Sequence, residues 1–533
     1  MDLAHILYRS ALRYPDNPLW VSTDRATVTY AEGAARVSAL ANAILARTEQ
    51  HSRVAILSTN RYEGLEAYFG VLAAGCAAVT LNPRGHAEDY RHAISDAEAS
   101  VVFCDASLAD KLEPLRAEPG SVRHWVCFGG EREGFDDYEK VLGDQPSTRP
   151  DLVIEPDDPA WIFYTSGTTG KPKGAVETHR NLLAMTRHFL LELGSDLAPT
   201  DVMLHLAPIS HGSCSVAFPH LAVGAANAFP AALSFDPASV FATIERLKIT
   251  STMLAPTMIR MLLDSPESGN YDLSSLKTVV YGAAPMPVTD VEEALEAFGP
   301  VFVQFYGQAE AAATITCLPK NEHRVDSETY RRRLGSAGRE TFATRIRIVD
   351  GDGRELPPGQ VGEITVRGEL VMPGYWRRPE ATADTIRNGW LHTGDAGYLD
   401  EDGYLFITDR IKDMIISGGS NIYAREVEDV LLRLPGIAQV AVIGVPDAKW
   451  GDVVGAVVVP AENAGLTAED VVDFARANMA SYKKPRHVWF TDKLPTSPYG
   501  KVLKRELRKI YGDPTASGSH RCATSTTSGA QTP

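Results

Sequence analysis

Basic residues are in deficit in this chain, and the shortage argues against one class of partner. The 533 residues include 52 Lys and Arg against 68 Asp and Glu, for a formal net charge of −16. A general nucleic-acid binder needs a basic surface to neutralise phosphates, so we expect no nucleic-acid partner. Net charge bears on solubility and association rather than on fold, and a local basic patch remains open.

Cysteine is scarce as well, which excludes a protein built on disulfides. Six cysteines are spread along the chain with no Cys-x-x-Cys pair, so no zinc-site pattern is present. Cys76, Cys104 and Cys127 lie in apolar runs and are expected to behave as small core residues. We therefore expect a soluble protein of a reducing compartment, the cytoplasm.

Long hydrophobic runs are missing too. The longest apolar stretches, such as VLAAGCAAV at 71–79, are too short to span a bilayer. The first sixteen residues lack a basic region followed by a clean apolar run, so we expect no signal peptide. With 44% hydrophobic and 23% charged residues, the composition is that of an ordinary globular protein of about three or four domains.

Helical and strand patterns alternate in two parts of the chain. Between 55 and 130, a helical stretch at Gly64–Ala74 is followed by short apolar runs at Ala77–Leu81, Val101–Cys104 and His124–Phe128. Between 240 and 306 the same alternation returns, with expected helices at 240–247, 257–263 and 288–298 and expected strands at 250–255, 278–281 and 301–305. This alternation predicts α/β architecture with largely parallel sheets.

The pattern of apolar and turn residues changes near residue 343. Strand alternation broken by Gly, Asp and Pro turns predicts antiparallel β structure over 343–409, with a hairpin at 396–407. Beyond 410, a helix with an apolar face at 427–434, strands at 440–445, 453–459 and 487–491, and a helix at 467–480 predict a small α+β domain. The Ser/Thr/Gly-rich end, 512–533, is expected to be a disordered tail.

The segment richest in chemistry is IFYTSGTTGKPKGAVETH, residues 162–179. An apolar strand runs into a loop of glycines, hydroxyl residues and two lysines, which together supply close backbone N–H groups and cationic donors for an anion. The spacing is not that of a Walker A loop. A flexible surface loop is the alternative, but the density of donors over the whole loop favours a polyphosphate site.

This loop resembles the signature of the adenylate-forming superfamily, which includes acyl- and aryl-CoA synthetases. QFYGQAEA (304–311) is similar to a second family motif, residues 390–431 to its ribose, hinge and thioesterification motifs, and PTSPYGKVLKREL (495–507) to its C-terminal lysine motif. The motifs agree in order and spacing, and the likeness extends over roughly residues 5–511.

The resemblance implies a two-step reaction. A carboxylate attacks the α-phosphate of ATP to give an acyl-adenylate and pyrophosphate, and a thiol, usually that of CoA, then displaces AMP. It also implies a large N-terminal domain (1–409) of αβαβα-type layered subdomains plus a β-rich subdomain, a small mobile α+β C-terminal domain (410–511) and the tail (512–533). ATP, Mg²⁺ and CoA are the implied cofactors and co-substrates, and a homodimer is compatible with the family.

The resemblance also assigns the nucleotide site. Glu310 would hold Mg²⁺, because a hard cation prefers carboxylate oxygen, and Lys501 would bridge the attacking carboxylate and the α-phosphate. Tyr306 would stack on adenine, and Asp395 and Arg410 would contact the ribose, although alone each is compatible with a core or surface role. The remaining ATP or AMP contacts are Thr165, Ser166, Gly167, Thr168, Thr169, Gly170, Lys171, Lys173, Gly282, Ala283, Ala284, Pro285, Gly307, Gln308 and Ala309.

One position departs from the family pattern. Ala309 stands where the family usually has threonine, which removes a hydroxyl expected near the phosphate. Gln308 is the candidate donor in its place.

A hinge at Lys412 would turn the C-terminal domain between the two steps. Glycines would then line a tunnel for the thiol arm of CoA, while aromatic and basic side chains would hold its nucleotide. The alternative for the basic residues is simple solvation. The residues assigned to CoA are Ser417, Gly418, Gly419, Trp450, Tyr482, Lys484 and Arg486.

The acyl pocket is expected between the 205–215 loop and the ends of the 281–307 strands. His211 would lie beside the substrate carboxylate, and the other pocket residues are Gly212, Ser213, Cys214, Tyr281 and Gly307. The region contains no acidic anchor for an amino group, and its small residues leave fatty and aromatic acids both open. A carrier-protein thiol as acceptor, or a member of the family that has lost turnover, are the alternatives to a free-standing acid–CoA ligase.

Overall fold

The computed structural model describes residues 2–23, 27–118, 120–165, 171–194, 197–230, 234–417, 420–462, 464–496 and 502–512. Contacts divide the chain into two units. The first comprises residues 1–347, 365–393 and 403–405, and the second comprises 348–364, 394–402 and 406–533. Four strands of the β-rich segment contribute residues to both units: β17 (Thr344–Val349), β18 (Gly362–Gly368), β21 (Trp390–Leu399) and β22 (Leu405–Arg410).

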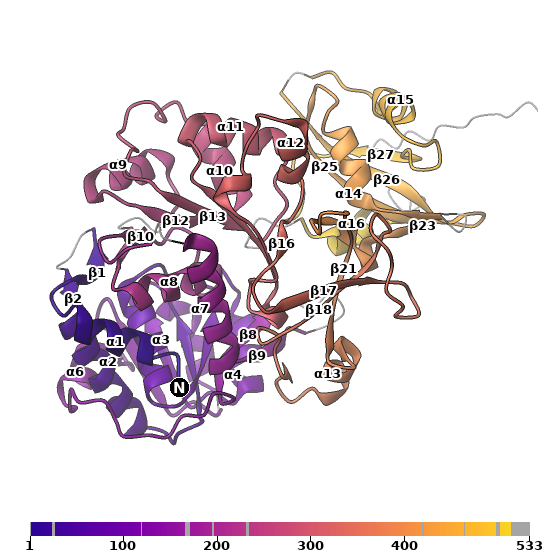
Figure 1. Cartoon of the computed structure of the whole chain (residues 1–533). Helices are drawn as coiled ribbons and strands as arrows, with labels where there is room; N and C mark the ends of the chain where they lie inside the picture. Colours follow the sequence, from indigo (N-terminus) through magenta and orange to yellow (C-terminus); the bar gives the residue numbers. More distant parts are fainter. Residues whose placement is uncertain are drawn as a thin grey trace, which may run out of the picture. The chain divides into compact units, whose positions relative to one another are not determined.

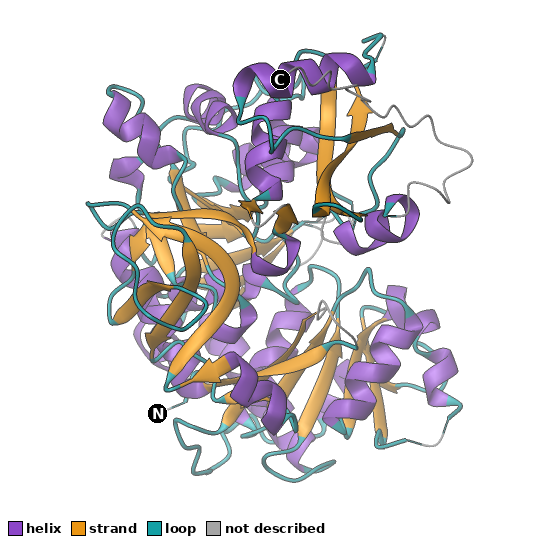
Figure 2. Ribbon diagram, turned by 90° about the vertical axis from the view of Figure 1, so that its right-hand side faces the viewer, coloured by secondary structure: helices purple, strands orange, loops and turns teal. Residues whose placement is uncertain are grey.

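The first unit contains two large sheets with helices beside their strands (Figures 1 and 2). One sheet has the order β19-β9-β8-β4-β3-β5-β6-β7. Its central strands pair in parallel, as the alternating pattern predicts. The bounds are β3 (Arg53–Leu57), β4 (Ala77–Leu81), β5 (Val101–Asp105), β6 (His124–Phe128), β7 (Asp136–Asp137), β8 (Pro159–Thr165), β9 (Lys173–Thr178) and β19 (Gly374–Tyr375).

The other sheet has the order β16-β15-β14-β13-β12-β10-β11-β1-β2. Parallel pairing joins β14 to β13, β13 to β12, β12 to β10, β10 to β11 and β11 to β1. The bounds are β1 (Pro18–Ser22), β2 (Val28–Thr29), β10 (Val202–Leu204), β11 (Ala226–Phe229), β12 (Ser251–Leu254), β13 (Thr278–Gly282), β14 (Phe302–Tyr306), β15 (Thr316–Leu318) and β16 (Arg339–Glu340).

Helices pack on these sheets through apolar faces. In Figure 1, α10 and α11 lie together beside β12 and β13. The helices of this unit are α1 (His5–Arg13), α2 (Tyr30–Leu45), α3 (Tyr62–Ala73), α4 (Ala87–Ala97), α5 (Glu113–Arg116), α6 (Tyr138–Gly143), α7 (His179–Leu193), α8 (Gly212–Val223), α9 (Pro237–Leu247), α10 (Pro256–Leu263), α11 (Val288–Phe298), α12 (Glu328–Leu334) and α13 (Pro379–Thr385).

Helix α8 was not predicted, since the sequence suggested a loop at 205–215. The helix begins at Gly212, contains Pro219, and is buried on nearly every side. A helix buried all round has no polar face and therefore no amphipathic period to read. The loop proper ends at His211, which precedes the first helical residue.

The predicted β-rich segment forms a sheet of order β17-β18-β21-β20, with β22 (Leu405–Arg410) also paired to β21 and β20 covering Ile386–Arg387. The pairing of β21 with β22 confirms the hairpin predicted at 396–407. The C-terminal part of the chain forms its own sheet of order β24-β23-β26-β25, with β27 beside β26. Its strands are β23 (Ile415–Ser417), β24 (Ser420–Ile422), β25 (Ile437–Asp447), β26 (Gly451–Pro460) and β27 (His487–Phe490).

The helices of this C-terminal part are α14 (Ala424–Leu431), α15 (Ala468–Asn478) and α16 (Lys504–Tyr511). One core cluster joins α14 and α15 to the sheet, and a second includes Leu507 and Tyr511 of α16. Helix α14 ends at Leu431, three residues before the predicted Leu434, which still packs against the first cluster from the following turn. The predicted fold class, α/β layers with a smaller α+β part, is confirmed.

None of the helices in the described ranges combines the length and the apolar character needed to cross a membrane.

Candidate active site

The arms of the predicted phosphate loop are strands β8 and β9. They pair antiparallel and end opposite each other at Thr165 and Lys173. Five predicted phosphate contacts come between these strands in sequence and lie outside the described residues, as does the side chain of Thr165: Ser166, Gly167, Thr168, Thr169 and Gly170. Lys171 is exposed. Lys173 is therefore the first residue of β9 and lies at the edge of the loop.

Lys173 and Glu310 meet at a residue that sequence analysis missed, Tyr375. The Tyr375 hydroxyl donates to Oε1 of Glu310 over 2.8 Å, and Nζ of Lys173 lies 5.1 Å from the centre of the Tyr375 ring. Strand β19 pairs antiparallel with β9, with Tyr375 opposite Ala175, which places the ring beside the strand that carries Lys173. No signal in the sequence pointed to Tyr375, because it lies about 200 residues away in a two-residue strand.

Glu177 is a second residue that sequence analysis left unassigned. It lies on β9, two positions beyond Ala175, and so faces the same side as Lys173. Its carboxyl group is buried, with 3% of the residue exposed, and Oε1 accepts a hydrogen bond of 3.2 Å from the Ala312 N–H. Oε2 has no partner among the described residues. Burial, with the nearby charge of Glu310, raises the pKa of Glu177 well above its usual value.

The turn that carries Glu310 has an uncommon backbone. Glu310 lies in a short 3-10 helix, Ala309–Ala311, and the next residues, Ala312 and Ala313, have φ of 33° and 56°. Alanine rarely adopts the left-handed region, and such conformations persist where surrounding contacts hold them. Here Glu177 accepts a hydrogen bond from the Ala312 N–H, and the Met372 N–H donates a hydrogen bond of 3.0 Å to the backbone carbonyl of Glu310.

The predicted adenine loop lies at the ends of neighbouring parallel strands. Gly282 ends β13 and is paired with Phe305 of β14, so residues 282–285 and 306–310 emerge at one sheet edge. Parallel sheets bind ligands at such carboxyl edges. Ala283, Ala284 and Pro285 are exposed, and Ala283 has a φ of 65°.

Backbone packing requires glycine at two positions of this region, Gly282 and Gly307. A Cβ on Gly282 would lie 2.2 Å from the Phe305 carbonyl oxygen, and one on Gly307 would lie 2.2 Å from the carbonyl carbon of Ala313. At Gly212, the space for a Cβ is filled by the Met253 side chain, whose Cε would be 2.5 Å away. The space beside Gly307, predicted as room for an apolar acid, is taken by backbone, whereas that beside Gly212 is taken by the end of a flexible side chain.

His211 lies at the end of the predicted acyl loop. Its ring packs edge-on against Phe163 with centroids 4.6 Å apart, and Nδ1 lies 2.8 Å from Ser210 Oγ. Burial lowers the pKa of His211 to about 3, so the imidazole is neutral near pH 7. A neutral ring acts on a substrate carboxylate through hydrogen bonding and packing rather than through charge.

The other predicted pocket residues lie deeper. Ser213 Oγ is 2.8 Å from Nδ1 of the buried His205, and the Tyr281 hydroxyl is 3.0 Å from Nε2 of His323. Cys214 is buried, which raises the pKa of its thiol, and it lines a small cavity beside the buried hydroxyl of Tyr68. The assignment of Ser213, Cys214 and Tyr281 to the acyl pocket remains a prediction.

The predicted ribose contacts form an ion pair within the second unit. Nε of Arg410, the last residue of β22, lies 2.6 Å from Oδ1 of Asp395, and Asp395 is 4% exposed. The neighbouring Asp409 accepts hydrogen bonds from the N–H groups of Arg410, over 2.7 Å, and Arg425, over 3.1 Å. Asp409 therefore joins the end of β22 to the first turn of α14.

Of the predicted CoA residues, Ser417 ends β23, Trp450 precedes β26, and Tyr482, Lys484 and Arg486 lie in the segment before β27. Ser417 is paired with Gly451, which places it beside Trp450. The guanidinium of Arg486 lies 5.2 Å from the Trp450 ring, and Trp450 and Tyr482 are both exposed. Burial and the charges of Arg476 and Arg486 lower the pKa of Lys484. This electropositive, aromatic patch suits a nucleotide phosphate.

Three further predicted residues, Gly418, Gly419 and Lys501, lie outside the described residues, and so does the side chain of the predicted hinge, Lys412. Residues near the hinge are described. Arg508 of α16 lies 2.8 Å from Oδ1 of Asp413, so α16 is tied to the segment that follows Arg410.

Comparison with known proteins places this geometry in a family. The model of the AMP-binding enzyme family matches residues 7–376, and that of the AMP-binding enzyme C-terminal domain matches residues 426–501. A feruloyl-CoA synthase of Amycolatopsis sp. is 40% identical over 488 residues, which cover 91% of this chain and 94% of that protein. A medium/long-chain fatty-acid–CoA ligase of Mycobacterium tuberculosis is 37% identical, covering 86% of this chain and 81% of that protein.

Comparison with solved structures gives the same family. The amide bond synthetase McbA from Marinactinospora thermotolerans matches with a TM-score of 0.85 at 31% identity, covering 96% of this chain and all of that one. The family match extends over more than half of the chain and includes the elements that carry Lys173, Glu310 and Tyr375. The chain therefore belongs to the AMP-binding enzyme family of adenylate-forming enzymes, as the resemblance of its motifs predicts.

Proposed function

We propose that this protein is an AMP-forming acid–thiol ligase. It activates a carboxylic acid with ATP to an acyl-adenylate and transfers the acyl group to CoA, releasing AMP and pyrophosphate. The observation that carries the proposal is the meeting of Lys173 and Glu310 at Tyr375, because a cation and a carboxylate held together suit a triphosphate and its metal ion.

Mg²⁺ fits the donor set around Glu310. Among the described residues there is no cluster of three or more His, Cys, Asp or Glu side chains that could cage a metal. Mg²⁺ usually binds through one or two carboxylates together with substrate phosphates, so the single carboxylate of Glu310 is an appropriate ligand. When bound, the ion would neutralise charge on the phosphates, and Tyr375 would keep the Glu310 carboxylate oriented.

The chain's own groups then act on the first step by position and charge. Lys173 would contact phosphate oxygens, Lys501 would neutralise charge between the carboxylate and the α-phosphate, and Asp395 with Arg410 would hold the ribose. The neutral His211 would orient the substrate carboxylate. For the second step, Ser417, Trp450, Lys484 and Arg486 would receive CoA after the domain 410–511 turns about Lys412 relative to the domain 1–409.

The decisive experiment is incubation with ATP, Mg²⁺, CoA and a panel of hydroxycinnamic, other aromatic and medium- to long-chain fatty acids. We expect AMP, pyrophosphate and one class of acyl thioester, identified by mass spectrometry. AMP without a thioester would favour a carrier-protein acceptor, or an amine such as an amide bond synthetase uses. No AMP with any acid would favour a member of the family without turnover.

Location and assembly complete the proposal. We propose that the enzyme acts in the cytoplasm, where ATP and CoA are available, and the five free cysteines among the described residues are compatible with a reducing compartment. A homodimer is the assembly to test by light scattering. Fractionation of the source cells, with a membrane marker and a periplasmic or secreted marker as controls, tests the location.

A further inference from the structure

A single side chain, Asn60, holds the loop that leads to His211. The two N–H groups of its Nδ2 are directed at three consecutive backbone carbonyls, those of His205, Leu206 and Ala207, at 2.9, 3.2 and 3.0 Å, so two of these carbonyls share one donor. Its Oδ1 accepts the Ile209 N–H over 3.0 Å. One amide therefore contacts four backbone groups of a segment about 145 residues away.

Asn60 lies in the loop between β3 and α3, at a position in the fold that suits a binding site. It follows β3, and the strand order β4-β3-β5 places the next strand in sequence on one side of β3 and the following one on the other. Ligands of α/β sheets bind at the carboxyl edge where the strand order reverses in this way. Asn60 thus stands where the first sheet is expected to contribute to a site.

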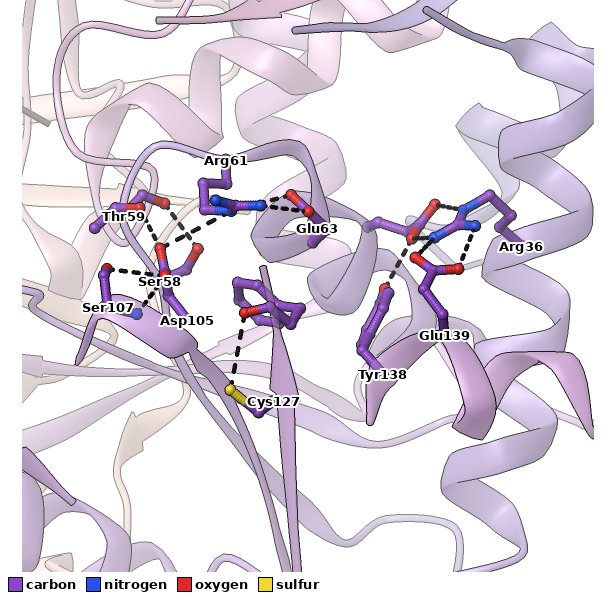
Figure 3. Close-up of polar contacts among 12 residues, drawn as sticks. Arg36, Ser58, Thr59, Arg61, Glu63, Asp105, Ser107, Cys127, Tyr138 and Glu139 are labelled. Atoms are coloured by element: carbon purple, nitrogen blue, oxygen red, sulfur yellow. Dashed lines mark hydrogen bonds and ion pairs between the residues drawn. The ribbon is translucent and has the colours of Figure 1, made fainter. Parts of the chain in front are cut away.

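The residues on either side of Asn60 are themselves anchored (Figure 3). The Thr59 hydroxyl donates to Oδ2 of Asp105, a carboxylate that is 2% exposed at the end of β5. Arg61 pairs with Glu63 over 2.6 Å and lies 3.9 Å from Asp105. Ser107 adds two hydrogen bonds of 2.9 Å to Oδ1 of Asp105. The turn that presents Asn60 is therefore held by its neighbours, and the amide has a defined direction.

Further hydrogen bonds connect the segment held by Asn60 to His211. Beyond Ile209, the Ser210 carbonyl accepts a hydrogen bond of 2.8 Å from Thr80 of β4, and Thr80 accepts one of 2.8 Å from Trp161 of β8. Ser210 Oγ then meets Nδ1 of His211. Strands β3, β4 and β8 are adjacent in one sheet, so the loop is fixed along a continuous edge that ends at His211 and the start of α8.

We propose that Asn60 is a positioning residue for the carboxylic-acid site, acting through residues 205–211 on His211 and the first turn of α8. The inference rests on the proposed function, since it assigns the acid site to His211. It predicts that Asn60 governs the binding of the acid and leaves the binding of ATP unchanged.

The test uses the full-length enzyme and measures KM for the acid and for MgATP separately by pyrophosphate exchange. For Asn60→Ala we expect KM for the acid to rise about tenfold or more, with KM for MgATP changed by less than about twofold, because the interaction lost serves one substrate. Hydrogen exchange of the amides in 205–211 should accelerate in the same variant. If Asn60→Ala does not fold, Asn60→Ser, which keeps one donor, is expected to show the same split.

The chain offers a matched control in Asn42 of α2. The two N–H groups of its Nδ2 are also directed at three backbone carbonyls, those of Ser38, Pro146 and Thr148, at 3.1, 2.8 and 2.9 Å. Asn42→Ala should leave both KM values and the exchange of 205–211 unchanged. The proposal is overturned if the Asn60 variant matches this control, or if both KM values rise together. A wild-type enzyme that activates no acid would instead refute the proposed function.

Discussion

The hydroxyl of Tyr375 donates to Oε1 of Glu310 over 2.8 Å and so joins a two-residue strand to the predicted Mg²⁺ ligand. Tyr375→Phe removes this donor without changing the ring that faces Lys173. We expect the Mg²⁺ concentration for half-maximal pyrophosphate exchange to rise about tenfold, the scale of one hydrogen bond to a charged group. Tyr138→Phe is the matched control, because the Tyr138 hydroxyl of the wild type also donates a hydrogen bond of 2.8 Å to a glutamate, Glu66, in another network. An unchanged Mg²⁺ requirement in Tyr375→Phe would contradict the role.

The Asp395–Arg410 pair should serve the nucleotide. Asp395→Asn keeps the shape of the side chain but removes its charge, and we expect KM for ATP to rise about tenfold with KM for the acid unchanged. Asp473→Asn breaks an ion pair of the same length, 2.6 Å, on the exposed side of α15 and should leave both values as they are. Equal effects of the two substitutions would argue against a ribose contact.

Glu177 should act by holding the Glu310 turn rather than by carrying charge. Because burial raises the pKa of its carboxyl group well above the usual value, Glu177→Gln should preserve the acceptor for the Ala312 N–H and leave the melting temperature within a few degrees of wild type. Glu177→Ala leaves that N–H buried without a partner and should cost about 1–3 kcal/mol of unfolding free energy. Thermal denaturation of the two variants side by side measures this, and equal losses would mean that charge matters.

The Arg486–Trp450 pair should contribute to CoA binding. Removing the guanidinium in Arg486→Ala takes away a cation over an exposed ring, and we expect KM for CoA to rise about five- to tenfold in thioester formation. Pyrophosphate exchange, which needs no CoA, should stay at the wild-type rate. Arg433→Ala, an exposed arginine beyond the end of α14, controls for loss of positive charge on this domain. A fall in exchange equal to the fall in thioester formation would contradict the assignment.

Buried histidines should make the fold sensitive to acid. Burial lowers the pKa of His205, His220 and His323 to about 4, against an ordinary value of 6.5. The folded state disfavours protonation of these three histidines. Their contribution to the free energy of unfolding is therefore fully present above pH 6.5. It is lost as the pH falls toward 4, by about 1.4 kcal/mol per pH unit for each group. Urea unfolding from pH 7.5 to 4.5 should follow this trend.

His205 is the residue to replace in that series, because Ser213 and Asn227 hold its two ring nitrogens at 2.8 and 3.0 Å. His205→Gln should be less stable at pH 7.5 and lose less stability on acidification than the wild type. A parallel loss in both proteins would show that His205 does not titrate in this range.

Much of the fold followed from periodicity. The strands at Ala77–Leu81 and His124–Phe128 and the helix at Val288–Phe298 were predicted with the bounds that the structure has, because apolar runs ended by turn residues, and an amphipathic face, are local properties of the chain. Helix α8 was missed for the opposite reason, since burial on all sides leaves no contrast between its faces.

The sequence by itself determined the family, the α/β class and the residue types of the predicted site, because glycines, hydroxyl groups, lysines and carboxylates at set spacings are readable along the chain. Only the tertiary structure showed that Tyr375 orients Glu310, that Glu177 holds the Ala312 turn and that Asn60 clamps the loop before His211. Each of these contacts joins segments far apart in sequence. Sheet pairing and the ends of parallel strands create such neighbours, and no local pattern records them.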